Sequence, residues 1–158
     1  MRLRTKFSLL AISALLISGA SYAYWTDQNT IWAPYERVKV LDGDSMVLEH
    51  RRVRLAYIDA PELAQTCKPH RPNGSVWKCG EIAKLKLIEL IAGRPVECRK
   101  IELDKYGRTL ANCYAGSISL NKEMVRSGFA IAYRRYSYEY VSEELEAMKA
   151  KRGVWSGS

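Results

Sequence analysis

The sequence predicts a mixed α+β fold, a small β-barrel of Greek-key type that carries helices. Three short segments early in the domain alternate apolar and polar residues and are separated by turn residues, as in a meander of strands. A segment with helical spacing follows, and then two strand-like segments joined by a hairpin turn and two further helices. Strands that meander before a helix are typical of small Greek-key barrels. The chain has 158 residues and no internal repeat, which indicates one domain.

Residues 1–23 have the three parts of a secretory signal peptide. Met1–Lys6 is basic, Phe7–Gly19 is an uninterrupted run of apolar and small residues, and Ser21 and Ala23 stand three and one before the predicted cleavage point. A membrane anchor is the alternative, but a spanning helix needs about 20 apolar residues and this run is shorter. We expect an exported protein, periplasmic or secreted, without stable membrane insertion after cleavage.

Residues 24–33 show no period and are predicted to form an N-terminal tail, and residues 34–158 to form the folded domain. Asp42–Asp44 is a turn signal between alternating segments, so a hairpin is expected there. A second turn is expected near His50–Arg52. The first three predicted strands are Glu36–Leu41, Ser45–Glu49 and Val53–Ile58.

The middle of the domain is predicted to hold one helix and one hairpin. Gly93 follows the apolar residues of the helix as a stop signal. The core-facing stripe of this helix is expected to be Ile82, Leu85, Ile88 and Ile91. Val96–Leu103 and Thr109–Tyr114 are predicted to be strands that the turn Asp104–Gly107 joins.

The last part of the domain is predicted to be mainly helical. Leu120–Ser127 is expected to be a short helix that ends before a glycine, and Phe129–Tyr133 a short strand. Glu139–Lys151 has the spacing of an amphipathic helix. Its inward face is expected to consist of Val141, Leu145 and Met148.

The four cysteines predict two disulfides, because their number is even and the chain is expected to be exported. Pairing of neighbours closes two short loops and fits the predicted strands. The expected bridges are therefore Cys67–Cys79 and Cys98–Cys113. The alternative is a metal site made of Cys67, His70 and Cys79, although thiolate ligands suit a reducing compartment better.

Three segments place charged groups beside turns, and the first is Asp42-Gly43-Asp44. Two carboxylates that lie close together repel each other unless a positive charge stands between or beside them. A hard divalent cation fits this need, since Ca²⁺ takes carboxylate and carbonyl oxygens. Taken alone, the segment is better explained as an ordinary turn, because Asp-Gly is favoured there.

The second segment joins a strand to an acidic loop. Arg54, Ala56 and Ile58 share one strand face if the strand is regular, and Asp59 and Glu62 lie at and beyond its end. The proline between the two acids stiffens the chain, so both could serve one metal-centred site. A solvated acidic loop is the alternative.

The third segment is the predicted hairpin tip, where Gly107 permits a tight turn that presents Tyr106 and Arg108. A guanidinium can make two parallel hydrogen bonds to a phosphate. A tyrosine ring can stack on a nucleobase. In isolation the segment is explained as a charged hairpin tip.

Together, the three segments resemble the staphylococcal nuclease (thermonuclease) family in order and spacing. The family pattern is a DGDT turn, an arginine eight residues before the glutamate of a D-x-P-E loop, and a later DKYGR turn. The corresponding residues here are Asp42–Ser45, Arg54 with Asp59–Glu62, and Asp104–Arg108. Met124–Ala130 and Arg152–Trp155 extend the resemblance, which covers Tyr35 to Trp155. It implies a five-stranded OB-fold barrel with three helices and Ca²⁺-dependent hydrolysis of the phosphodiester bonds of DNA and RNA.

The resemblance also implies roles for individual residues. One Ca²⁺ would be held by Asp44, Asp59 and the carbonyl group of Ala60. The implied catalytic residues are Arg54, Glu62 and Arg108, and the implied substrate contacts are Lys105, Tyr106 and Tyr133. Ser45 replaces the usual threonine of the first turn, and the cysteine-bearing loop after Glu62 differs from the lysine-rich loop of the founding member.

The net charge of +8 favours polyanionic partners such as nucleic acid, although three basic residues belong to the predicted signal peptide. A non-catalytic nucleic-acid-binding protein of the cell envelope is the main alternative, because OB-folds bind single strands through basic grooves. Such a protein does not need Arg54, Glu62 and Arg108 together, whereas the implied hydrolysis uses all three. A structural envelope domain is a third alternative. We expect a monomeric nuclease.

Overall fold

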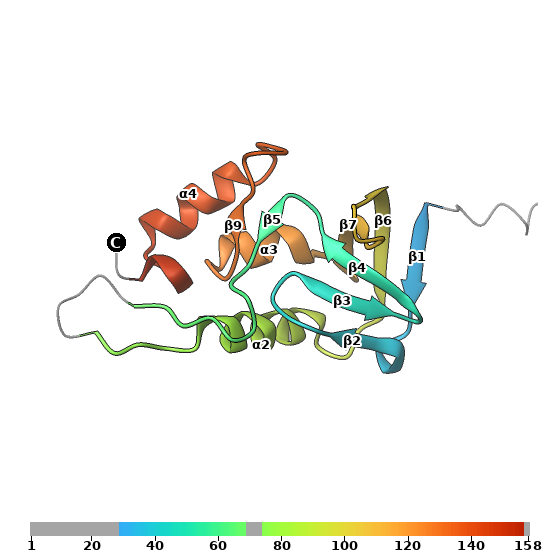
Figure 1. Ribbon diagram of the computed structural model, residues 1–158, viewed down its shortest axis with the longest axis horizontal. Coiled ribbons are helices and arrows are strands. Elements are labelled where there is room, and N and C mark those ends of the chain that lie inside the picture. The colour runs from blue at the N-terminus through green and yellow to red at the C-terminus, as the bar shows by residue number, and fades with distance from the viewer. Residues whose placement is uncertain (1–28, 69–73, 157–158) are drawn as a thin grey trace, which may run out of the picture.

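The computed structural model describes residues 29–68 and 74–156 (Figure 1). The predicted signal peptide, residues 1–23, lies outside the described residues, and so does His70. Among the helices within the described ranges, none has the length and apolar character needed to cross a membrane.

Seven strands form one curled sheet in the order β1-β6-β7-β4-β3-β2, with β8 paired to β7. Neighbouring strands are antiparallel except β4 and β7, which are parallel. The strands are β1 (Thr30–Ala33), β2 (Val38–Val40), β3 (Ser45–Leu48), β4 (Arg51–Leu55), β6 (Val96–Leu103), β7 (Thr109–Ala115) and β8 (Ile118–Ser119). The five predicted barrel strands are confirmed as β2, β3, β4, β6 and β7, so the sheet has the expected OB-fold-like architecture.

Three α-helices accompany the sheet, as expected (Figure 1). They are α2 (Cys79–Ile91), α3 (Leu120–Arg126) and α4 (Val141–Lys149), and the short 3₁₀ helices η1 (Tyr35–Arg37) and η2 (Gly153–Trp155) complete the described helical segments. Helix α3 lies between α2 and α4 and also packs on β7. The sheet, α2 and α3 therefore enclose one apolar core.

The predicted N-terminal tail includes a strand. Thr30–Ala33 forms β1, which pairs antiparallel with β6 over the register Thr30↔Arg99 to Ala33↔Val96. The strand buries Ile31 and Ala33 and leaves Trp32 exposed. Four residues with two inward positions are too few to show alternation in the sequence, so hydrogen bonding to β6 decides their structure.

The predicted strand Val53–Ile58 is interrupted, so the expectation that Arg54, Ala56 and Ile58 share one regular strand face was wrong. Strand β4 ends at Leu55, and Tyr57 adopts a φ of 64°. The chain then forms β5 (Ile58–Asp59), which pairs with β9 (Ile131–Ala132) in a separate two-stranded sheet. The left-handed residue turns the chain from its neighbour β7 toward β9, and the Tyr57 carbonyl accepts a hydrogen bond from the Tyr133 N–H at 2.8 Å.

Helix α2 buries a different stripe from the predicted one. Of the four residues expected in the core only Ile91 is buried, and Ile82, Leu85 and Ile88 are exposed. The buried residues are Cys79, Gly80, Ala83, Leu87 and Ile91. The predicted set and the buried set both have helical spacing. Only the buried set contains small residues, which let the helix approach neighbouring backbone closely.

The predicted inward face of α4 is confirmed only at Val141, which packs against the core. Leu145 and Met148 are exposed, whereas Glu143 and Glu144 are buried with only 8% and 4% of their surface exposed. Glu144 accepts a hydrogen bond from the Ala132 N–H at 3.1 Å and pairs with the Arg134 guanidinium. Buried carboxylates with such partners avoid the cost of an unpaired charge, and periodicity cannot reveal those partners.

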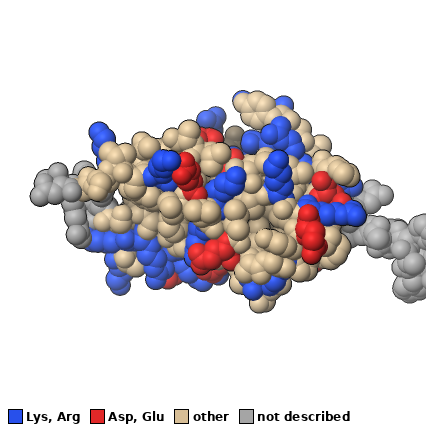
Figure 2. All heavy atoms as spheres, turned by 90° about the horizontal axis from the view of Figure 1, so that it is seen from below, with Lys and Arg blue, Asp and Glu red and all other residues tan. Residues whose placement is uncertain are grey.

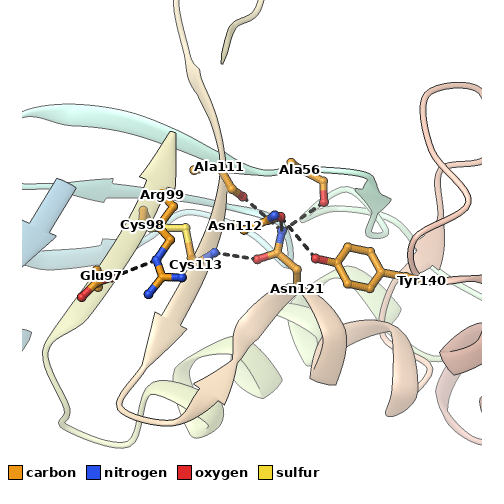
Figure 3. The surroundings of a disulfide bond; sticks show 9 residues. All are labelled: Ala56, Glu97, Cys98, Arg99, Ala111, Asn112, Cys113, Asn121 and Tyr140. Atoms are coloured by element: carbon orange, nitrogen blue, oxygen red, sulfur yellow. Dashed lines mark hydrogen bonds and ion pairs between the residues drawn. A yellow bond between two sulfur atoms is a disulfide. The ribbon is translucent and has the colours of Figure 1, made fainter. Parts of the chain in front are cut away.

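Both predicted disulfides are present, Cys67–Cys79 and Cys98–Cys113, and no cysteine is free. The alternative thiolate metal site is therefore excluded. Figure 3 shows Cys98–Cys113 joining β6 to β7 beside the side chain of Asn121, which comes from α3.

Asn121 has no exposed surface and ties α3 to two strands (Figure 3). Its amide NH₂ donates to the carbonyl oxygens of Ala56 and Ala111 at 3.0 and 3.1 Å. Its oxygen accepts from the Cys113 N–H at 2.9 Å. One side chain therefore satisfies buried backbone groups beside β4 and within β7.

Replacing Asn121 with leucine should destabilise the protein by about 2–4 kcal/mol, since each buried group left unpaired costs about 1–3 kcal/mol. The Ala56 carbonyl and the Cys113 N–H lose the partners described above. The same polar-to-apolar change at the exposed Lys39 is the control, expected within about 0.5 kcal/mol of the parent. Urea unfolding measures both variants, and equal stability of the two would contradict the assigned role of Asn121.

Candidate active site

The first acidic segment forms a tight turn between β2 and β3. One carboxylate oxygen of Asp42 accepts from the N–H groups of Asp44 and Ser45 at 3.0 and 2.7 Å, and the other accepts from the Ser45 hydroxyl at 2.7 Å. Asp42 is thus engaged within the turn. The Ser45 hydroxyl makes the contact that the turn needs, so the exchange of threonine for serine leaves the local geometry intact.

Asp44 points inward and meets Arg54 from the neighbouring strand. The register pairs Ser45 with Arg54, and the Arg54 guanidinium lies 2.8 Å from both carboxylate oxygens of Asp44. The same guanidinium lies 2.8 Å from the Asp59 carboxylate. The sequence-predicted residues Asp44, Arg54 and Asp59 therefore meet in one charged cluster.

Burial raises the pKa of Asp44 to about 7, even though the Arg54 charge and the Ala60 N–H, which donates to Asp44 at 3.1 Å, both lower it. The nearby carboxylates of Asp42 and Asp59 raise it further. One guanidinium thus does not fully compensate the buried negative charge. A carboxyl group perturbed in this way marks a candidate functional site.

The third segment forms the hairpin tip between β6 and β7, as predicted. Gly107 has a φ of 75°, and Asp104 accepts from the N–H groups of Tyr106 and Arg108, both at 2.9 Å. Asp104 also accepts from the Arg108 guanidinium at 2.7 Å. The charges of Lys105 and Arg108 lie 5.0 and 5.5 Å from the centre of the Tyr106 ring, which is 71% exposed. The exposed ring and two cations form a surface suited to a base and a phosphate.

Strand register places the three segments on adjacent strands. Ser45 pairs with Arg54, and Arg54 pairs with Leu110 across the parallel β4–β7 contact. Asp44 directly precedes Ser45, and Arg108 precedes Leu110 by two residues. The Asp44 turn and the Arg108 hairpin therefore extend from strands on either side of β4.

Glu62 and Tyr133 lie in loops that follow the short strands β5 and β9. Glu62 follows β5 and is exposed, and its backbone N–H donates to the Gln65 side chain at 3.2 Å. Tyr133 is held beside β5 by its hydrogen bond to Tyr57, and its ring lies 5.0 Å from that of Tyr136 in an edge-on contact. Tyr133 therefore lies next to the chain that carries Asp59.

Gly43 and Asp104 position candidate site residues, although the sequence predictions gave them no role. A methyl group on Gly43 would lie 2.8 Å from the β-carbons of both Ala60 and Ala83, so only glycine lets the acidic turn pack between the Asp59 loop and α2. Asp104 holds Arg108 through both backbone and side chain. The four-residue spacing of opposite charges around a glycine turn was the available signal for Asp104.

Comparison with known proteins identifies the family of this chain. The family model described as staphylococcal nuclease homologue matches residues 52–157. The chain belongs to the staphylococcal nuclease family. A micrococcal nuclease of Shigella flexneri is 36% identical, over 94% of this chain and 86% of its own length. An uncharacterized endonuclease of Haemophilus influenzae is 32% identical, over 94% and 78%, and a thermonuclease of Staphylococcus hyicus is 28% identical, over 77% and 75%.

The staphylococcal nuclease family match begins after the Asp42–Asp44 turn, so the place of Asp44 in the site rests on its contacts with Arg54 and Ala60. Among the described residues, no group of three or more His, Cys, Asp and Glu side chains could hold a metal ion. The donors that do come together are two carboxylates, from Asp44 and Asp59, beside the backbone of Ala60. This small set of hard oxygen donors fits Ca²⁺ or Mg²⁺ completed by water, and does not fit zinc.

The raised pKa of Asp44 predicts a pH dependence of stability in metal-free buffer. Between its ordinary pKa of 3.8 and about 7, the folded protein binds a proton that the unfolded chain has lost. Stability therefore falls as pH rises through this range, by at most about 1.4 kcal/mol per pH unit. Asp44→Asn should remove this contribution, so unfolding free energies measured in chelator from pH 4 to 7.5 should fall more steeply for the parent. Parallel curves would contradict the assigned pKa shift.

Proposed function

We propose that the chain is an exported, Ca²⁺-dependent nuclease that hydrolyses phosphodiester bonds of DNA, RNA or both. The observation that carries the proposal is the meeting of Asp44, Arg54 and Asp59 in one charged cluster. Arg54 lies on β4, and the neighbouring strand β7 follows the Arg108 hairpin. A module that only binds nucleic acid gains nothing from a buried carboxylate whose charge is incompletely compensated. Membership of the staphylococcal nuclease family supports the same reaction class.

Asp44, Asp59 and the carbonyl group of Ala60 would hold the metal. A bound Ca²⁺ would polarise the phosphate and help to orient it. The incompletely compensated charge of Asp44 supports this assignment, because a second positive charge would stabilise the ionised carboxylate that burial disfavours.

The two arginines would bind the phosphate that reacts. A guanidinium offers two parallel hydrogen bonds to phosphate oxygens, and its contribution grows as negative charge develops on them. Arg54 is fixed by two carboxylates and Arg108 by Asp104, so both groups are oriented before substrate arrives. Such preorganisation lowers the cost of reaching the transition state.

Glu62 would orient the attacking water and accept its proton. Its side chain is exposed at the start of the loop that follows Asp59, where water can reach it. An ionised carboxylate within hydrogen-bond reach of a water can serve as general base. As the water oxygen bonds to phosphorus, the P–O bond to the leaving oxygen would break. The leaving oxygen would take a proton from solvent, to which Glu62 would pass the proton that it accepted.

Lys105, Tyr106 and Tyr133 would contact the nucleic acid beside the reacting phosphate. The Tyr106 ring is exposed and flanked by cations, which favours stacking with a base. Lys and Arg side chains also spread over the face seen in Figure 2, the side on which α2 lies in Figure 1. This distribution favours association with a polyanion.

Export rests on the sequence of residues 1–23, and the two disulfides support it, since such bonds persist in oxidising compartments. A monomer remains our expectation.

Chelation should abolish activity, and excess Ca²⁺ should restore it, because the carboxylate pair needs the cation to bind substrate phosphate productively. Calorimetry should show one Ca²⁺ per chain, and Asp59→Asn should weaken its binding at least tenfold, about 1.4 kcal/mol. Glu97→Gln, an ion-paired residue on β6, is the control and should bind Ca²⁺ like the parent. Undiminished activity in EGTA with no bound metal would refute the metal assignment.

Glu62→Gln should lower kcat by about 10²–10⁴-fold, the usual contribution of a positioned general base. The substitution keeps the size of the side chain, so KM and thermal stability should change little. Glu89→Gln, an exposed residue of α2, is the matched control and should retain full turnover. Steady-state kinetics on single- and double-stranded DNA and on RNA provide the measurement, and an unchanged kcat would remove Glu62 from the catalytic set.

A further inference from the structure

The first turn of α2 leaves no room for a side chain at Gly80. A methyl group there would lie 1.8 Å from the carbonyl oxygen of Glu62 and 2.8 Å from that of Leu63. Non-bonded carbon atoms prefer separations of about 3.5–4.0 Å, so contacts this short are strongly repulsive. Gly80 is not among the residues with positive φ. Glycine is therefore required here by the close approach of the Glu62 backbone, and not by the helix itself.

The loop that carries Glu62 also caps α2. Lys78, at the N-cap position, makes no side-chain capping hydrogen bond. The Gly80 N–H donates instead to the Gln65 carbonyl oxygen at 3.2 Å, and the Gln65 N–H donates to the Glu62 carbonyl oxygen at 2.8 Å. The Gln65 side chain accepts from the Glu62 N–H at 3.2 Å. Both backbone polar groups of Glu62 are thus tied to a turn that rests on the helix end.

Covalent and aromatic contacts fasten this turn through the residues that directly precede Gly80. Cys79 precedes Gly80, is fully buried and is bonded to Cys67, two residues after Gln65. Cys67 and Trp77 exchange two backbone hydrogen bonds, at 2.9 and 3.0 Å. The Trp77 ring packs edge-on against Phe129, with 6.4 Å between the ring centres. The Glu62 loop is therefore held to α2 although it has no strand of its own.

We infer that Gly80 and Gln65, secured by the Cys67–Cys79 bridge, are positioning residues that set where the Glu62 carboxylate stands relative to the Asp44–Arg54–Asp59 cluster. The inference rests on the proposed catalytic role of Glu62. Asp59 is fixed by β5 and Arg54 by β4, whereas Glu62 stands beyond the last paired residue. Contact with α2 supplies the missing constraint, because displacement of a reacting group by about 1 Å can cost 10²-fold in rate.

The test combines Gly80→Ala with Glu62→Gln in a double-mutant cycle. The added methyl group has to displace the Glu62 backbone, so a purely structural effect predicts lower thermal stability with an unchanged kcat of the folded enzyme. We expect Gly80→Ala to lower kcat about 10²-fold while KM and Ca²⁺ affinity change little, since the loop moves and the metal ligands do not. In the Glu62→Gln background the same substitution should have almost no further effect, because it acts through Glu62.

Gly93→Ala is the matched control at the opposite end of α2. Gly93 has a φ of 74° and open space around it, so alanine there strains the backbone without touching the Glu62 loop, and should lower Tm but not kcat. If Gly80→Ala does not fold, the exposed Gln65→Ala carries the same test, with a smaller fall in kcat expected. Two results would overturn the inference. One is an unchanged kcat in Gly80→Ala, or in Gln65→Ala where that variant replaces it. The other is a fall in kcat that is equally large in the Glu62→Gln background. Full activity of Glu62→Gln alone would instead refute the proposed function of Glu62.

Discussion

The buried amide of Asn121 is the interaction on which the placement of β4 and the acidic loop depends. Strand β4 ends where the chain must leave its parallel neighbour β7, and this departure exposes backbone groups in the core. Asn121 satisfies the Ala56 carbonyl at that point and binds β7 at Ala111 and Cys113. The direction in which the chain continues toward Asp59 is therefore set from α3, a helix more than sixty residues later in the sequence.

The charges of the Asp44–Arg54–Asp59 cluster are not fully balanced, and this imbalance indicates a function. Arg54 contacts both Asp44 and Asp59, yet burial still raises the pKa of Asp44 to about 7. A cluster selected for stability alone would pair each buried carboxylate fully or replace it with an apolar residue. A site short of positive charge is instead suited to a divalent cation and an anionic substrate that arrive together. The geometry of this charged cluster thus favours function over stability.

Features encoded by neighbouring residues could be predicted from the sequence, and features decided by distant partners could not. The turns at Asp42–Asp44 and Asp104–Gly107 and both disulfides are local, and all are confirmed. Two faces of helix α2 have residues at helical spacing that could be buried. The face that contains Ala83 is buried, although it is the less hydrophobic of the two, because Gly43 approaches Ala83 closely. In α4, ion pairs with other elements allowed Glu143 and Glu144 to be buried. Strand β1 exists because β6 provides its hydrogen bonds.

The two disulfides differ in what they constrain, although they close loops of similar length. Their sequence separations are 12 and 15 residues, and the chain-entropy model assigns about 3 kcal/mol to a loop of 15. Cys98 and Cys113 already face each other in the β6–β7 register, so their bridge reinforces an arrangement that the sheet and Asn121 impose. Cys67 has one isolated bridge to Trp77 and no strand around it. The Cys67–Cys79 bond therefore fastens the described segment Glu62–Cys67, which has no strand of its own, to the start of α2. Its loss should change the position of Glu62 more than the free energy of unfolding.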